Sequence, residues 1–387
     1  MFFGGEGWDK VLKVCILISV QRPNEVRVFH REARTLQRAG YDVDIVAQDD
    51  YSYQSEGINV IAIGAPKNRL HRMLRSYRLF FAAIRQNPDI YHIHNPELLF
   101  WGVLLHWTLG KPVVYDVHEC FKDAVMLREW IPRWIRKPLS IAIGLYEKLL
   151  SRAVSYTVTA DIPTADQFTG DPAQVSVLFN YPILEYYSSE SPSNCFPGEP
   201  TLVHAGSITR ERGSDTLIEA VKLLLRRQPK LKVLIIGSTG DAPAKHFVHR
   251  VRTEGLSDTI LFTGTVDHRF IPQYLRQAHV GLSLLEDVPK FQKNIPQKVF
   301  EYLASGLPVV ATALPPLIPY ALQTSALQLV RPGEPAEVAG AIDVLISNPA
   351  LAKRLGEEGR DLVLQKYNWE NESAKLIALY ANLTGKS

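Results

Sequence analysis

Lys298 and Glu301 lie one helical turn apart in residues 294–312, "NIPQKVFEYLASGLPVVAT". This segment predicts a short helix followed by a buried strand, with Pro296 in the first turn and Gly306 at the left-handed end. A cation at Lys298 would oppose the helix dipole unless an anion lies nearby. Glu301 faces the same way and could accept two hydrogen bonds from a vicinal diol such as a ribose. The alternative interpretation is a surface ion pair of little energetic value.

A second group of residues could hold an anion. Residues 204–220, "HAGSITRERGSDTLIEA", predict a strand, a tight loop at Gly206 and Ser207, and then a helix. Arg210 and Arg212 lie beside the helix N-terminus, where free N–H groups and the dipole favour an anion. An ordinary connection with solvated arginines is the alternative. Combined with the charged pair above, the loop predicts a nucleotide-sugar site that offers cations, amides and a diol acceptor.

Polar side chains also follow two strands of the first half, in "YHIHNPELL" (91–99) and "VVYDVHECF" (113–121). Ligands of such sheets bind at the carboxyl ends of strands, so these side chains are expected to cluster there and contact substrate. The residues concerned are His94, Asn95, Asp116, His118 and Glu119. The His-x-His pattern could begin a metal site, but no third ligand has a suitable spacing, so no metal is predicted.

Two basic segments also contain aromatic residues. Residues 65–87 contain six Lys or Arg residues and no carboxylate, interleaved with apolar side chains, and residues 128–139 add tryptophans and arginines. Such segments suit the surface of an anionic membrane. The alternative is a helix that packs on the sheet while its arginines extend to solvent. Nucleic acid is not an expected partner because no nucleic-acid motif is present.

The bulk composition excludes several classes of protein. With 387 residues, 46% hydrophobic and 21% charged, the chain should form two packed domains. A net charge of +3 is too small to indicate nucleic acid by itself, and three distant cysteines do not suggest a disulfide framework. No signal peptide and no run of about 20 apolar residues is evident. A cytoplasmic location is expected, with any anchoring peripheral at the inner face of the membrane.

Strand-like runs alternate with helix-length segments along the whole chain, which predicts parallel sheets covered by helices. Residues 186–200, "YYSSESPSNCFPGEP", interrupt the alternation and read as a linker. A second series of strands begins at residue 201. The sequence therefore predicts an α/β protein with two doubly wound halves, and the cleft between them is the default site.

The chain resembles the retaining glycosyltransferases of family 4, whose two-domain fold is called GT-B. The motifs that carry the resemblance are "HIHNPELL", "YDVHE", "AGSITRERGSDTLIEAVKLL", "ILFTGTV" and, most specifically, "PQKVFEYLASGLPVVAT". The resemblance implies two Rossmann-like domains that face each other across a cleft. An acceptor-binding domain would span residues 1–190, a nucleotide-sugar-binding domain residues 200–365, and a C-terminal helix at 366–387 would cross back to the first domain.

The resemblance also implies roles for particular residues. The donor-binding residues would be Gly206, Ser207, Arg212, Val266, Pro296, Lys298, Val299 and Glu301. The catalytic residues would be His118, Arg212, Lys298 and Glu301. The acceptor side would comprise Arg27, His94, Asn95, Asp116, His118 and Glu119. In these roles Glu301 binds the donor ribose, Arg212 and Lys298 hold the diphosphate, and His118 lies beside the transferred sugar.

The sequence departs from the family pattern in three places. The first of the two usual glutamates, separated by seven residues, is replaced by Lys293, and Glu286 or Asp287 could substitute for it. Ser207 and Arg212 occupy the places of the usual Arg and Lys of the phosphate loop. The loop at residues 19–27 has no glycine, so Arg22 or Arg27 could contact phosphate or acceptor.

The expected reaction transfers a sugar from a UDP- or GDP-type donor, with retention, to a saccharide or lipid-linked saccharide of envelope polysaccharide synthesis. Cationic side chains would stabilise the leaving diphosphate, so no metal cofactor is expected. The leaving phosphate itself would take the acceptor proton. Two alternatives remain open: a nucleotide-sugar epimerase and a nucleotide-sugar-binding protein without turnover. An NAD dehydrogenase is disfavoured because no Gly-x-Gly-x-x-Gly motif follows either first strand.

Overall fold

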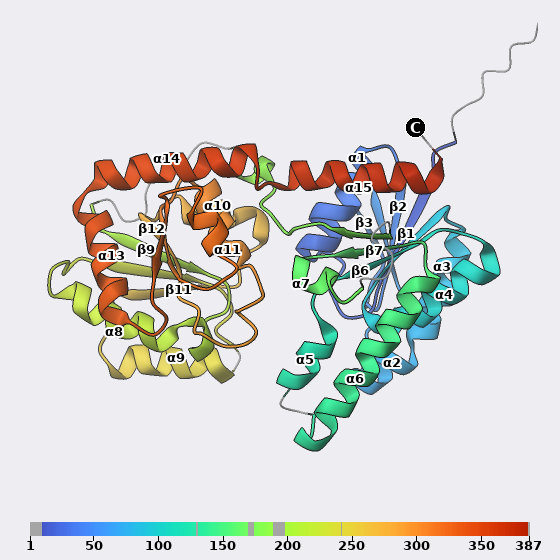
Figure 1. The fold of residues 1–387 in the computed structure, drawn as a ribbon, viewed down its shortest axis with the longest axis horizontal. Helices are drawn as coiled ribbons and strands as arrows, with labels where there is room; N and C mark the ends of the chain where they lie inside the picture. The colour runs from blue at the N-terminus through green and yellow to red at the C-terminus, as the bar shows by residue number, and fades with distance from the viewer. Residues whose placement is uncertain (1–9, 129–130, 169–173, 189–197, 241, 386–387) are drawn as a thin grey trace, which may run out of the picture. The chain divides into compact units, whose positions relative to one another are not determined.

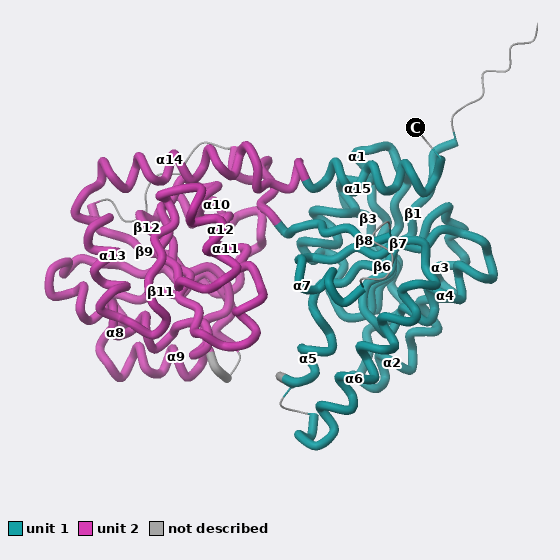
Figure 2. Tube along the Cα trace, in the orientation of Figure 1, with its two compact units in different colours: residues 1–180, 372–387 teal, residues 181–371 magenta. Residues whose placement is uncertain are grey.

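The computed structural model describes residues 10–128, 131–168, 174–188, 198–240 and 242–385. The chain forms two compact units, one of Met1–Asn180 with Glu372–Ser387 and the other of Tyr181–Asn371 (Figure 2). Most of the expected linker, residues 189–197, lies outside the described residues, as do Glu129 and Trp130 of the second basic segment. Within the described residues, no helix is both long enough and apolar enough to span a membrane.

Unit 1 is built on an eight-stranded sheet with the order β3-β4-β2-β1-β5-β6-β7-β8 (Figure 1). All neighbouring strands pair in parallel except the hairpin β3–β4. The strands are β1 (Lys13–Ile18), β2 (Asp42–Ala47), β3 (Tyr53–Ser55), β4 (Ile58–Ala62), β5 (Ile90–His94), β6 (Val113–Val117), β7 (Tyr156–Thr159) and β8 (Val175–Val177). The predicted parallel sheet is confirmed, but the antiparallel hairpin was not foreseen.

Helices cover both faces of this sheet. One face is covered by helices that pack in the main apolar core: α3 (Ser76–Gln86), α4 (Pro96–Leu109), α5 (Phe121–Leu127) and α6 (Arg133–Leu150). The short helix α2 (Arg69–Leu74) directly precedes α3. The other face contacts the π-helical segment η1 (Val26–Ala33), which continues into α1 (Arg34–Arg38), and α15 (Trp369–Thr384). The short α7 (Ile162–Ala165) follows β7.

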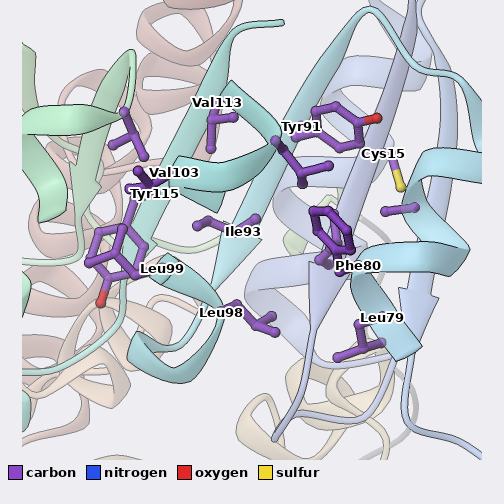
Figure 3. Packing of buried hydrophobic residues seen from close by; sticks show 14 of the residues in the cluster. Cys15, Leu79, Phe80, Tyr91, Ile93, Leu98, Leu99, Val103, Val113 and Tyr115 are labelled. Atoms are coloured by element: carbon purple, nitrogen blue, oxygen red, sulfur yellow. The ribbon is translucent and has the colours of Figure 1, made fainter. Parts of the chain in front are cut away.

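The two faces of β5 and β6 carry different kinds of side chain because neighbours along a strand point to opposite faces. Tyr91, Ile93, Val113 and Tyr115 belong to the main apolar core with residues of α3 and α4 (Figure 3). The alternate residues of the same strands, His92, His94 and Asp116, face η1 and α15 and are completely buried. The strands thus place a polar cluster on the side opposite to the core.

Unit 2 contains a six-stranded, wholly parallel sheet with the order β11-β10-β9-β12-β13-β14. Its strands are β9 (Thr201–Ala205), β10 (Lys232–Ile236), β11 (Ile260–Gly264), β12 (Val280–Ser283), β13 (Val309–Thr312) and β14 (Leu327–Val330). Its helices are α8 (Ser214–Leu225), α9 (Ala242–Thr253), α10 (Ile271–Leu275), α11 (Gln297–Ala304), α12 (Ile318–Ala321), α13 (Pro335–Ser347) and α14 (Pro349–Gln365). All the strands predicted for this half are confirmed, and this is the architecture of a doubly wound α/β domain.

Candidate functional site

Four predicted donor-site residues of unit 2 meet at the carboxyl end of β9. Gly206 has φ +102, and a Cβ there would lie 3.7 Å from Lys298 Nζ and 3.8 Å from a guanidinium nitrogen of Arg212. Two cationic groups from distant segments therefore converge on Gly206, whose backbone conformation only glycine adopts readily. Ser207 closes the loop, and its carbonyl accepts a 3.4 Å hydrogen bond from Arg212. A pair of cations beside a backbone without a side chain suits a diphosphate, which can approach the main-chain groups closely.

The electrostatics of Lys298 reflect this convergence. Its Nζ lies 3.2 Å from Nε2 of the buried His204. Burial and the neighbouring charge of Arg212 lower the pKa of Lys298 to about 7, against a smaller opposing effect of Glu301. Burial and Lys298 likewise hold the pKa of His204 well below its usual value, so that imidazole stays neutral. An anion bound at this point would remove the repulsion between the two cations.

Glu301 does not form the surface pair that was the alternative interpretation. It lies on α11, its residue is only 8% exposed, and its Oε1 is 3.9 Å from Nδ1 of His268. Among the described residues, no ion pair within 4.0 Å joins it to Lys298. A buried carboxylate that forms no ion pair with Lys298 retains acceptor capacity for a ligand hydroxyl.

Residues that were not singled out from the sequence hold this site in shape. The buried hydroxyl of Tyr302 accepts from the Ala205 amide at 2.7 Å and donates to the Leu282 carbonyl at 3.2 Å, which ties α11 to β9 and β12. A Cβ at Gly237 would lie only 2.4 Å from the Gly206 carbonyl oxygen. Glycine signals were available in the sequence, but the partners of Tyr302 depend on strand order.

The remaining donor-side predictions occupy the same end of the sheet with different degrees of exposure. Pro296 precedes α11 as its N-cap, Val299 is completely buried, and Val266 is half-buried two residues beyond β11. Lys293 is exposed, whereas Glu286 accepts a 2.8 Å hydrogen bond from Thr216. The roles of all these residues remain predictions.

The predicted acceptor-side residues of unit 1 belong partly to one buried network. The guanidinium of Arg27 contacts both oxygens of Asp116, at 3.0 and 3.2 Å from Nε, and Oε1 of Glu32 at 3.0 Å. It also donates to the Leu178 carbonyl and to Asn180. Burial alone would raise the pKa of Asp116, but Arg27 lowers it well below its usual value. Asp116 is therefore a buried carboxylate neutralised by Arg27.

Two histidines extend the network toward solvent. His94 Nδ1 lies 2.7 Å from His118 Nε2, and His118 Nδ1 lies 3.3 Å from the amide nitrogen of Gln21. The His118 side chain is 18% exposed, whereas His94 is completely buried. Burial lowers the pKa of both imidazoles, so both are neutral near pH 7. His118 is thus the accessible end of a rigid array.

Two predicted acceptor-side residues do not join this array. Asn95 adopts φ +77, and its side chain accepts hydrogen bonds from the amide and hydroxyl of Ser19. Glu119 is 39% exposed and pairs with Arg128 at 3.1 Å. Glu119 was expected to cluster with the strand-end residues, but it lies between β6 and α5 and its carboxylate pairs with Arg128 instead.

Glu32, His92 and Tyr380 were not predicted from the sequence as members of this network. Glu32 meets Arg27 because η1 is π-helical, a form with i→i+5 hydrogen bonds that aligns residues five apart. An α-helix would place them about 140° apart around its axis. Tyr380 comes from the far end of the chain and contacts His92 Nδ1 at 2.7 Å. Only the His-x-His spacing gave a signal for His92.

Two family models match separate parts of the chain. Residues 26–171 match the glycosyl transferase 4-like domain, and residues 199–348 match glycosyl transferases group 1. A relative with similar sequence is the MMP alpha-(1->4)-mannosyltransferase of Mycolicibacterium hassiacum, 24% identical over 318 residues, which are 79% of this chain and 73% of the relative. Alpha-D-kanosaminyltransferase of Streptomyces kanamyceticus is 25% identical over 185 residues, but these are only 48% of this chain and 46% of that protein.

Solved structures with the same fold cover nearly the whole chain. Sucrose-phosphate synthase from Thermosynechococcus elongatus superposes with a TM-score of 0.74 at 18% identity, over 97% of this chain and 100% of that one. The Anabaena protein HepE, solved in complex with UDP-glucose, gives a TM-score of 0.71 at 15% identity, over 96% and 99% of the two chains.

These matches, together with the two parallel sheets, define the class as α/β glycosyltransferases with the two-domain GT-B fold. Within that class, the chain belongs to the glycosyltransferases of family 4 type. The resemblance stated from the motifs is thereby confirmed.

Proposed function

We propose that the protein transfers a sugar from a nucleoside diphosphate donor to a saccharide or lipid-linked saccharide, with retention of anomeric configuration. The observation that carries the proposal is the convergence of Lys298 and Arg212 on Gly206 at the carboxyl end of β9. The UDP and UDP-glucose bound to the Anabaena structure support the same class of donor, in the UDP or GDP series.

The chemistry follows from where charge develops. Departure of the diphosphate builds negative charge on its oxygen, and Lys298 and Arg212 would stabilise that charge without a metal in the reaction. Glu301 would accept hydrogen bonds from the donor ribose, and the amide groups of Gly206 and Ser207 would bind the phosphates. The leaving phosphate would accept the acceptor proton, so no carboxylate base is assigned. His118 would contact the transferred sugar as a neutral imidazole.

Transfer can be tested with a panel of UDP- and GDP-sugars, with and without saccharide acceptors. Release of nucleoside diphosphate should require or be greatly accelerated by an acceptor, and NMR of the product should show the donor's anomeric configuration. Arg212→Ala should lower the rate by roughly 10²-fold, as is typical when one stabilising donor is removed. An isomerised nucleotide sugar formed without acceptor would favour the epimerase, and binding without turnover would favour the sugar-nucleotide-binding protein.

We also propose that unit 1 docks on an anionic membrane through α2 and α6 at the cytoplasmic face, where a lipid-linked acceptor in polysaccharide synthesis would lie. None of the six residues of α2 is buried, and Leu70, Met73 and Leu74 are 67%, 54% and 66% exposed. On α6, Trp134 and Leu149 are 79% and 68% exposed. Exposed apolar groups among arginines suit an anionic bilayer surface.

A further inference from the structure

Four buried side chains of unit 1 direct ligand-type atoms at one point. Glu32, His92, His94 and Asp116 each offer an oxygen or nitrogen, these atoms lie within 4.8 Å of one another, and all four residues are 0% exposed. Oε2 of Glu32 and Nε2 of both histidines have no hydrogen-bond partner among the described residues. Because a buried polar atom without a partner costs free energy, an ion bound at the point where these atoms converge would be stabilised.

We propose that this cluster is a closed binding site for one divalent transition-metal ion of the zinc type. Two imidazoles and two carboxylates form a four-ligand set that Zn²⁺ accepts, whereas Ca²⁺ and Mg²⁺ prefer oxygen ligands alone. The His-x-His pair places both imidazoles on one face of β5, and η1 and β6 supply the carboxylates.

The separations between the ligand atoms can be compared with those expected around an ion. Bonds of about 2.1 Å to a tetrahedral ion would separate the ligand atoms by about 3.4 Å. His94 Nε2 lies 3.3 Å from Glu32 Oε2, His92 Nε2 lies 3.9 Å from Glu32 Oε2, and His92 Nε2 lies 3.7 Å from Asp116 Oδ2. All four ligand atoms lie within 4.8 Å of one another, so small movements of the side chains would bring them to the distances of a metal site.

Each candidate ligand also contacts a second protein group outside the cluster. His92 Nδ1 lies 2.7 Å from the Tyr380 hydroxyl, and His94 Nδ1 lies 2.7 Å from His118 Nε2. Arg27 Nε lies 3.0 Å from the outer oxygen of Glu32 and contacts Asp116. Outer contacts of this kind orient the ligands of protein metal sites, although Oδ2 of Asp116 would be shared between Arg27 and the ion.

The balance of charge around the cluster restricts what it can bind. The guanidinium of Arg27 supplies one positive charge to two carboxylates and shares Asp116 with any bound ion. Glu25 adds a third carboxylate nearby and caps η1. A divalent ion would add positive charge to this group of carboxylates.

A site with four protein ligands and no exposed atom has no open position for substrate, so the ion would be structural. It would tie η1 to β5 and β6 and, through His94, fix the imidazole of His118. This inference departs from the expectation that the chain binds no metal, and it leaves the transfer reaction itself metal-independent. It stands on unit 1 alone and does not depend on the proposed donor.

The test is metal stoichiometry of the purified full-length protein. The chain is treated with a chelator, incubated with Zn²⁺ or Co²⁺, freed of excess ion and analysed by mass spectrometry of the metal. We expect about one ion per chain and, for Co²⁺, the visible absorption of a four-coordinate centre. Glu32→Gln and His92→Ala should lose both signals, whereas His246→Ala, at an exposed histidine of unit 2, should keep them.

Glu32→Gln is the decisive variant because an amide has nearly the same shape as a carboxyl group and should leave the circular dichroism spectrum unchanged. Wild-type protein that retains no stoichiometric ion would overturn the proposal. Retention of the ion by folded Glu32→Gln and His92→Ala would overturn it as well, because the ion would then be bound adventitiously elsewhere. If His92→Ala does not fold, the wild-type stoichiometry and the Glu32→Gln result decide.

Discussion

At the scale of single residues, Lys298 is the group whose ionisation should depend most on the ligand. Burial and Arg212 disfavour its charged form, which lowers its pKa to about 7 in the unliganded protein. A diphosphate would stabilise the charged form and raise the pKa again. Donor binding should therefore be coupled to proton uptake by this lysine.

This coupling predicts a pH dependence of donor affinity. Below about pH 7 Lys298 is already charged, so affinity for a UDP- or GDP-sugar should be nearly constant. Above pH 7 binding must first protonate it, so affinity should weaken by up to about tenfold per pH unit until the pKa of the complex is reached. A nucleotide sugar is the right probe because it lacks the secondary phosphate ionisation of a free diphosphate.

Lys298→Arg provides the matched control. Its guanidinium stays charged throughout this range, so its affinity profile should be flat between pH 7 and 9. Calorimetric titrations of both proteins measure the difference. If Lys298→Arg shows the same pH dependence as the wild type, another group is responsible and the electrostatic account of Lys298 is wrong.

At the scale of elements, the sequence was most informative about features that depend on local backbone geometry. The sequence placed His94 and Asp116 beside two buried strands, and the structure has them within β5 and β6, on the face opposite to core residues such as Tyr91. Turn chemistry correctly placed Gly206 after a strand. These features are local, so a single sequence can reveal them.

What could not be predicted depends on tertiary structure. The π-helical form of η1 brings Arg27 to Glu32, and no propensity of the segment distinguishes it from an α-helix. The β3–β4 hairpin is short and carries no Asn-Gly or Asp-Gly turn. Tyr380 reaches His92 from 288 positions along the chain. Contacts of this separation require the sheet order before they can be inferred.

The exposed face of α2 leads to a prediction about membranes. Arg69 of α2 and Arg78 of α3 are exposed, whereas Arg72 and Arg75 are only half-exposed, so Arg69 and Arg78 are the better positions to change. Arg69→Glu/Arg78→Glu should weaken sedimentation with phosphatidylglycerol-containing vesicles by at least about tenfold, since each basic residue contributes about 1 kcal/mol near such a surface.

The control for the vesicle experiment carries the same change of net charge elsewhere. Lys353 and Arg354 are exposed on α14 of unit 2, and Lys353→Glu/Arg354→Glu should bind vesicles as the wild type does. If all three proteins partition equally onto the anionic vesicles, the proposed docking surface is wrong. Neutral phosphatidylcholine vesicles should bind none of them strongly.

At the scale of the whole molecule, the chain passes between its two units twice, at Asn180–Tyr181 and at Asn371–Glu372 (Figure 2). The residues assigned to the donor lie in unit 2, whereas the network of His118, Arg27 and Asp116 lies in unit 1. Donor binding and the buried cluster can therefore be examined separately. A donor-site variant should leave the unit 1 network intact, because no side chain of that network belongs to unit 2.

The central claim is that unit 2 binds a nucleotide sugar through Lys298, Arg212 and Glu301. Titration calorimetry of the wild type and Glu301→Ala with a panel of UDP- and GDP-sugars tests it most directly. The wild type should bind one series, and Glu301→Ala should bind it roughly 10- to 100-fold more weakly while keeping its fold, because hydrogen bonds to a charged group contribute about 1.5–3 kcal/mol. Equal affinity of the two proteins, or no binding by the wild type, would contradict the claim.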